Sequence, residues 1–175
     1  MKSSACGQAI LTAASGLPAC TKPWPASGYI WAMVGWGVDA LLHRETRPHK
    51  DLDVLVLLGD LPKLRQWLDE HGFTLKLVWQ ESRRLDEEAD RWPTAFVVAD
   101  SQGRELDVHL IDIGPNGHII QHYDDPWPLP DSIAGQGSIA GTDVPCVSKA
   151  TQLAMHTGYS LPDGHLRDID LLRAD

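Results

Sequence analysis

The sequence is poor in cysteine and in basic residues, and it has no long apolar run. Only three cysteines occur among its 175 residues, and they form neither a Cys-x-x-Cys pair nor a Cys/His cluster with zinc-site spacing. Their odd number does not suggest a disulfide framework, so we expect reduced, buried thiols. No stretch approaches the ~20 consecutive apolar residues of a transmembrane helix, and we therefore expect no membrane partner.

The shortage of basic residues argues against a protein that wraps long nucleic acid. The chain has 15 Lys and Arg against 24 Asp and Glu, and its formal net charge at pH 7 is -9. A phosphate backbone requires a basic face. A small substrate that is cationic or bridged by metal ions fits an acidic protein better.

The N-terminus weakly imitates a lipoprotein export signal. Lys2 precedes a mildly apolar run that leads to Cys20, but Gln8 interrupts the run and Pro18 stands where a small residue is usual. We therefore expect a cytoplasmic protein.

What the chain does contain predicts one α+β domain. A length of 175 residues suits a single compact domain, and 43% hydrophobic with 22% charged residues is a globular balance. A proline-rich segment at 22–28 separates the first 28 residues, whose role is open, from the domain expected over 29–175. Residues 114–141 are rich in Gly, Pro and Asp, and we expect a long loop there with at most short elements.

Apolar periodicity places the elements of this domain. Runs of strand length and composition predict strands at residues 29–34, 52–58, 73–79, 94–99 and 105–113. Helical spacing predicts helices at residues 36–42, 61–70, 149–157 and 166–173. Asp60 and Ser148 are the expected caps of the second and third of these helices. The resulting fold is a mixed sheet with helices and a small helical part at the C-terminus.

Carboxylates mark two of the predicted strands. Asp51 and Asp53 stand at the start of the strand at 52–58, and Asp107 and His109 lie in the strand at 105–113. Side chains two residues apart on a strand point to the same face, so three carboxylates converge if these strands are neighbours. Clustered carboxylates repel one another unless a cation neutralises them, and oxygen ligands favour Mg2+ or Mn2+. Such a site supports phosphoryl or nucleotidyl transfer.

An isolated Asp-x-Asp is more often solvated surface, so its surroundings decide its meaning. Residues 35–56 combine a glycine turn, a helix, a basic stretch and the acidic pair, in an order typical of the DNA polymerase β-like nucleotidyltransferase fold. Residues 29–175 resemble the small antibiotic nucleotidyltransferases, most closely the lincosamide nucleotidyltransferases and more distantly the aminoglycoside 2''-adenylyltransferases. The resemblance rests on five blocks in order: GWGVD at 35–39, TRPHKDLD at 46–53, Trp79 with Ser82-Arg83, LDVH at 106–109 and PCVSKATQLAMHTGY at 145–159.

The resemblance implies the minimal nucleotidyltransferase fold, a mixed twisted sheet flanked by helices. It also implies that Asp51 and Asp53 hold the metal ions. Asp107 would be the third carboxylate, either completing the metal site or acting as general base on the acceptor hydroxyl. The cofactor would be Mg2+ or Mn2+, and the co-substrate ATP or another nucleoside triphosphate.

The same resemblance assigns the nucleotide and acceptor contacts. Gly35 would offer its backbone N–H to the phosphates at the start of a helix. The family usually has two adjacent glycines before the tryptophan, whereas Val34 precedes Gly35 here. We expect this change to affect the affinity for the nucleotide. The remaining expected nucleotide contacts are Trp36, Arg47, His49 and Lys149. The expected acceptor contacts are His109, Trp79 and Arg83.

Most of these residues have a plain structural alternative. Tryptophan is usually a core residue, which applies to Trp36 and Trp79. A lysine in the first turn of a helix, such as Lys149, is commonly at the surface. His109 could equally be a hydrogen-bonded core residue, and the basic stretch could be a solvated loop.

The leading expectation is an enzyme that transfers a nucleoside monophosphate, AMP from ATP, to a hydroxyl of a small acceptor. Lincosamide-like or aminoglycoside antibiotics are the acceptors that the resemblance implies, and a homodimer is the assembly it favours. One alternative keeps the chemistry but uses a metabolite or a protein hydroxyl. Another is a nucleotidyltransferase-like antitoxin or interaction module without catalysis.

Overall fold

The computed structural model describes residues 30–79, 93–114, 119–121, 127–129 and 133–174. Its strands are β1 Ile30–Ala32, β2 Leu52–Leu57, β3 Thr74–Val78, β4 Ala95–Ala99, β5 Glu105–Ile113, β6 Ile119–Gln121, β7 Trp127–Leu129, β8 Ala134–Ile139 and β9 Thr142–Val147. Its helices are α2 Val34–Leu41, the short 3-10 helix η1 Leu58–Asp60, α3 Leu61–Glu70, α4 Lys149–Met155 and α5 Asp163–Ala174.

These strands form one mixed sheet, which confirms the predicted α+β class. The order is β3-β4-β5-β2-β1-β9-β8, and β6 extends the sheet from β5 to β7. β2 pairs with β5 in parallel and with β1 antiparallel. β3, β4 and β5 form an antiparallel meander. A tight turn at 100–103 joins β4 to β5, with Gly103 at a φ of 81°.

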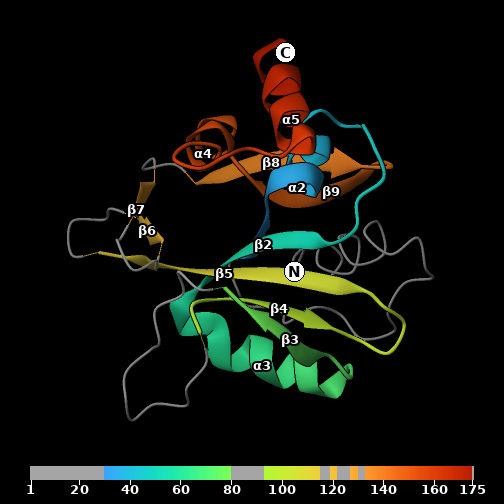
Figure 1. Cartoon of the computed structure of the whole chain (residues 1–175), viewed down its shortest axis with the longest axis vertical. Coiled ribbons are helices and arrows are strands. Elements are labelled where there is room, and N and C mark those ends of the chain that lie inside the picture. The colour runs from blue at the N-terminus through green and yellow to red at the C-terminus, as the bar shows by residue number, and fades with distance from the viewer. Residues whose placement is uncertain (1–29, 80–92, 115–118, 122–126, 130–132, 175) are drawn as a thin grey trace.

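Helices cover the two ends of the sheet (Figure 1). α3 packs beside β3 and β4 through buried Leu64, Trp67 and Leu68, while α2 lies with α4 and α5 over β8 and β9. β2 is buried along nearly its whole length, as its unbroken apolar run predicts. The central strands therefore sit between α3 and the group formed by α2, α4 and α5, and α2 contacts β2, the strand that carries Asp53.

The segment predicted as a long loop at 114–141 contains more strand than expected, because the six-residue β8 lies within it beside the three-residue β6 and β7. The glycines that suggested a loop allow close packing instead. A Cβ at Gly137 would lie 2.3 Å from the carbonyl oxygen of Ala40 in α2, and one at Gly135 would lie 2.9 Å from that of Val147 in β9. Glycine is thus required where a helix backbone and a neighbouring strand press against β8.

Smaller differences concern the ends of elements. The first strand ends at Ala32, and Val34 already begins α2. Ser148 caps α4 as predicted, because its side chain accepts a hydrogen bond from the Thr151 N–H. Asp60 precedes α3 but makes no side-chain cap, because its carboxylate accepts a hydrogen bond from Lys63 instead. No described helix combines the length and apolarity needed to span a membrane.

Candidate active site

The parallel pairing of β2 with β5 brings the predicted carboxylates together. Asp53 lies directly opposite Asp107 in the register, so their side chains leave the sheet on the same face. Ligand atoms of Asp53, Asp107 and His109 all lie within 4.8 Å of one another. The expectation that neighbouring strands juxtapose these groups is therefore confirmed, and His109 joins the cluster.

Asp51 stands at the edge of this cluster, one residue before β2 begins. Burial raises the pKa of the Asp51 carboxyl, Lys50 opposes that shift, and the charge of Asp107 reinforces it. The effect is larger on Asp53, where burial and the charges of Asp107 and Asp51 raise the pKa well above its usual range. The carboxylates thus repel one another in a partly dehydrated place, which is the situation that a bound cation relieves.

Two neighbours orient the Asp107 carboxylate. The indole N–H of Trp79 donates a hydrogen bond to Asp107 Oδ1 at 2.9 Å, and His109 Nε2 lies 3.2 Å from the same oxygen. Asp107 itself is only 6% exposed, whereas Trp79 is 38% exposed. Trp79 therefore does not behave as an ordinary core residue, because its ring faces solvent beside the carboxylate that it holds.

The oxygen-rich donor set of this site fits a divalent metal ion. Asp53 and Asp107 offer carboxylate oxygens close together, with Asp51 near them, and Mg2+ and Mn2+ prefer such hard ligands. His109 adds one nitrogen, which Mn2+ accepts more readily than Mg2+. Burial first, and then the charges of Asp107 and Asp51, raise the pKa of Asp53, so a nearby cation would favour its ionised form.

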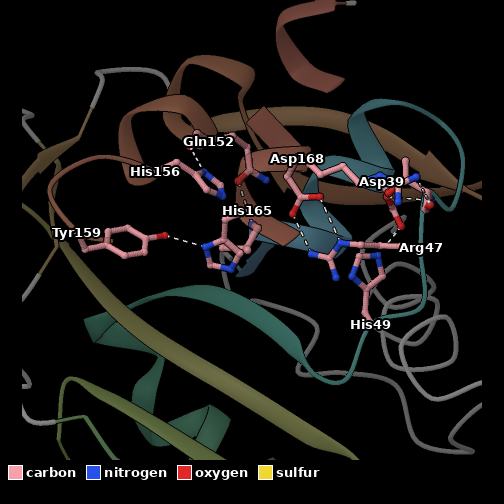
Figure 2. A network of polar contacts seen from close by, with 11 residues as sticks. Asp39, Arg47, His49, Gln152, His156, Tyr159, His165 and Asp168 are labelled. Carbon is pink, nitrogen blue, oxygen red and sulfur yellow. Dashed lines mark hydrogen bonds and ion pairs between the residues drawn. The ribbon is translucent and has the colours of Figure 1, made fainter. Parts of the chain in front are cut away.

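The predicted cations of the loop before β2 are held by acidic partners. Figure 2 shows Arg47 reaching Asp168 of α5, with Nη2 2.9 Å from Oδ2. His49 Nε2 lies 2.6 Å from Oδ2 of Asp39 in α2. Asp39 and Asp168 are fully buried, so these contacts fasten the loop to both helices.

The start of α2 lies against these two side chains. A Cβ at Gly35 would lie 2.4 Å from His49 Nδ1 and 3.1 Å from Arg47 Nη2. Glycine is thus required here by the chain's own packing. Trp36 is 4% exposed and belongs to the hydrophobic core, so only its backbone is in a position to meet a nucleotide.

The C-terminal helices contribute polar side chains that the predicted site did not include. Gln152 and His156 come from α4 and the residue after it, and His165 comes from α5 (Figure 2). The Tyr159 hydroxyl lies 2.9 Å from His165 Nδ1. Burial and then the charge of Asp53 raise the pKa of Tyr159, while burial and then His156 lower that of His165.

The influence of Asp53 on Tyr159 indicates that this C-terminal group faces the carboxylates. His156 and Tyr159 lie in the last block of the sequence resemblance, which was a usable signal. Asp168 gave none, because it looks like any acidic residue of an amphipathic helix. Lys149 is exposed at the start of α4, and Arg83 lies outside the described residues.

The chain was compared with known families and proteins. The family described as aminoglycoside-2''-adenylyltransferase matches residues 26–172. A lincosamide resistance protein of Staphylococcus haemolyticus is 26% identical over 146 residues, covering 82% of this chain and 83% of the relative.

Two solved structures share the fold. Lincomycin-bound LnuA, a lincosamide antibiotic adenylyltransferase, has a TM-score of 0.66 and 25% identity, covering 84% of this chain and 87% of LnuA. ANT(2'')-Ia in complex with adenylyl-2''-tobramycin has a TM-score of 0.62 and 18% identity, covering 94% of this chain and 84% of that one. With the family match over residues 26–172, these findings show that the chain belongs to the aminoglycoside-2''-adenylyltransferase family and is a nucleotidyltransferase.

Proposed function

We propose that this protein transfers AMP from ATP to a hydroxyl group of a small antibiotic and releases pyrophosphate. The observation that carries the proposal is the direct opposition of Asp53 and Asp107 on parallel strands of a nucleotidyltransferase fold. Lincosamide-like and aminoglycoside antibiotics are the acceptors we propose, because the relatives are named for them.

Asp51, Asp53 and Asp107 would hold Mg2+ or Mn2+. The bound metal would neutralise phosphate charge and assist nucleophilic attack at the α-phosphorus. Burial and then the charges of Asp107 and Asp51 raise the pKa of Asp53, and this supports the assignment because a bound cation would offset both effects.

Asp107 is also the candidate general base. The acceptor oxygen would form a bond to the α-phosphorus, the bond from that phosphorus to the pyrophosphate oxygen would break, and the hydroxyl proton would pass to a carboxylate. Hydrogen bonding from Trp79 fixes the direction of the Asp107 carboxylate, which supports the role because proton transfer requires defined geometry. We propose that Asp107 both binds the metal ion and accepts the proton of the acceptor hydroxyl.

The triphosphate would lie between the first turn of α2 and the loop before β2. The backbone N–H groups of Gly35 and Trp36 come before the first helical hydrogen bond, from Gly37 N–H to the Met33 carbonyl. Arg47 and His49 pack against Gly35 and would meet the phosphates from the side. Lys149 of α4 is a further candidate for phosphate contact.

The acceptor would approach Asp107 along the exposed ring of Trp79. This ring offers an apolar surface for a sugar or aliphatic part of an antibiotic. His109 contacts Asp107 from the same strand and would orient the same substrate end. Arg83 completes the proposed acceptor contacts.

We also propose that the protein acts in the cytoplasm, which supplies ATP, as a homodimer built from the single domain at 29–175. The continuous sheet from β3 to β8 supports one domain. Sedimentation of the full chain tests the dimer, and a monomeric mass at assay concentration would contradict it.

Product analysis tests the proposed reaction. The protein, Mg2+ and labelled ATP are incubated with a panel of lincosamides and aminoglycosides, and a product heavier by one AMP is expected by mass spectrometry. Asp53→Asn and Asp107→Asn should lower the rate by at least about 100-fold. Asp69→Asn, on the exposed face of α3, is the matched control and should keep full activity. Absence of an adenylylated product with every acceptor of the panel would sink the proposal.

A further inference from the structure

The turn between β1 and α2 has an unusual backbone. Val34 has a φ of 52°, in the left-handed region that favours glycine. A β-branched side chain is especially costly there, because its branch crowds the neighbouring carbonyl groups. Such a conformation persists only where surrounding contacts hold it.

Two hydrogen bonds hold this turn. The Met33 N–H donates to the Asp53 carbonyl at 3.0 Å, which ties the turn to the strand of the metal site. The Val34 N–H donates to Gln152 Oε1 of α4 at 2.9 Å. An N–H requires an acceptor, so the Gln152 amide can have only its oxygen toward Val34.

Gln152 is built into this place. Its side chain is fully buried, and a Cβ at Gly37 would lie 2.3 Å from its Nε2. Within the part of the chain that the structure describes, no group accepts a hydrogen bond from Nε2. A buried amide with an unused donor carries a free-energy cost. The hydrogen bond to Val34 offsets this cost, and it explains why a glutamine occupies this buried position.

We propose that Gln152 is a positioning residue for the nucleotide, which acts by holding Val34 in its left-handed conformation. The direction of the chain at Val34 sets where the N–H groups of Gly35 and Trp36 point. With the bond to Gln152 in place, these donors face the triphosphate beside the carboxylates of β2. This inference rests on the proposed nucleotidyl transfer, because the donors are assigned to the phosphates of its co-substrate.

The test separates positioning from packing by a double-mutant cycle. Gln152→Met keeps the length and volume of the side chain but removes the acceptor. Released from its partner, Val34 relaxes to an ordinary conformation and turns the phosphate donors away. The Kd of a non-hydrolysable ATP analogue with Mg2+, measured by calorimetry, should rise roughly tenfold, which equals ~1.4 kcal/mol.

Val34→Gly should suppress this effect, because glycine adopts the left-handed conformation without support. In the Val34→Gly background, Gln152→Met should change the Kd by less than about threefold. The melting temperature should stay lowered, because the N–H of residue 34 remains buried without an acceptor. Gln66→Met is the matched control, since Gln66 donates its side-chain hydrogen bond to Glu70 on the exposed face of α3, and it should leave the Kd unchanged.

An unchanged Kd in Gln152→Met, or an equal loss of affinity in both backgrounds, would show that Gln152 is a packing residue and would overturn the inference. Failure of the wild-type protein to bind the analogue would overturn it as well. If the wild type binds the analogue but adenylylates no acceptor, the proposed reaction fails while the binding cycle still decides the role of Gln152.

Discussion

Replacement of Gly35 by alanine tests whether the basic loop and α2 are packed as tightly as the structure shows. The new Cβ would lie 2.4 Å from His49 Nδ1 and 2.6 Å from His49 Cε1, whereas ordinary contacts begin at 3.4 Å. The imidazole must therefore move by about 1 Å. Such a shift breaks its 2.6 Å contact with the buried carboxylate of Asp39.

The magnitude follows from the two opposing effects. Loss of a hydrogen bond to a carboxylate costs about 1.5–3 kcal/mol, and alanine in place of glycine returns up to ~1 kcal/mol in a helix. Gly35→Ala should thus lower the free energy of unfolding by about 1–2 kcal/mol and the melting temperature by about 2–8 °C. Urea titration followed by circular dichroism measures the first quantity, and calorimetry the second.

Two further variants make this prediction decisive. Gly59→Ala introduces the same methyl group where nothing lies within 4 Å, and it should leave stability unchanged or raise it slightly. His49→Ala removes the side chain that the new Cβ strikes, so adding Gly35→Ala to His49→Ala should cost little more. Wild-type stability in Gly35→Ala, or strictly additive losses in the double variant, would refute the reasoning.

Three other predictions concern the turn and the carboxylates. Val34→Gly should be more stable than Val34→Ala by about 1 kcal/mol in urea titrations, the reverse of the usual order, because only glycine is unstrained at positive φ; a more stable alanine variant would contradict the left-handed turn. In the presence of a chelator, the free energy of unfolding should fall as pH rises above about 4, because the raised pKa of Asp53 makes the folded state retain a proton that the unfolded state releases. In denaturation measured across pH, the free energy of unfolding of Asp53→Asn should change less with pH. Identical pH dependence in the two proteins would argue against the raised pKa. Trp79→Phe keeps an aromatic ring but removes the hydrogen bond to Asp107. It should lower kcat roughly tenfold and leave the KM for ATP unchanged in steady-state kinetics with varied ATP. An unaltered kcat would show that the hydrogen bond is dispensable.

The contacts of Arg47 and His49 alter the electrostatic role that the sequence suggested for the loop before β2. Arg47 pairs with the buried carboxylate of Asp168, so part of its charge is neutralised within the protein, and His49 contacts the buried carboxylate of Asp39. Their packing on Gly35 also defines the shape of the proposed phosphate site. Binding of a triphosphate would therefore depend on the precise placement of these groups as much as on their charge.

Local patterns in the sequence are enough to place the strands that carry the site. The unbroken apolar run of β2 and the alternation of Asp107 with His109 are local patterns, and strand geometry turns them directly into a buried strand with carboxylates on one face. The sequence does not show that these two strands are neighbours, whereas the fold pairs β2 with β5. The glycine-rich β8 was missed because its glycines are explained by packing contacts that the sequence does not display. Gly137 faces Ala40 of α2, which is nearly a hundred residues away, and Gly135 faces Val147 of β9.

The contribution of the C-terminal part to the site depends on contacts between residues far apart in the chain. The contact between Val34 and Gln152 spans 118 positions and that between Arg47 and Asp168 spans 121, so neither leaves a periodic trace in the sequence. The left-handed backbone at Val34 is likewise invisible locally, because a valine in a run of apolar residues predicts an ordinary strand. Side-chain alternation and hydrophobic periodicity are properties of neighbouring residues, whereas strain, close approach and long-range pairing exist only once the chain has closed upon itself.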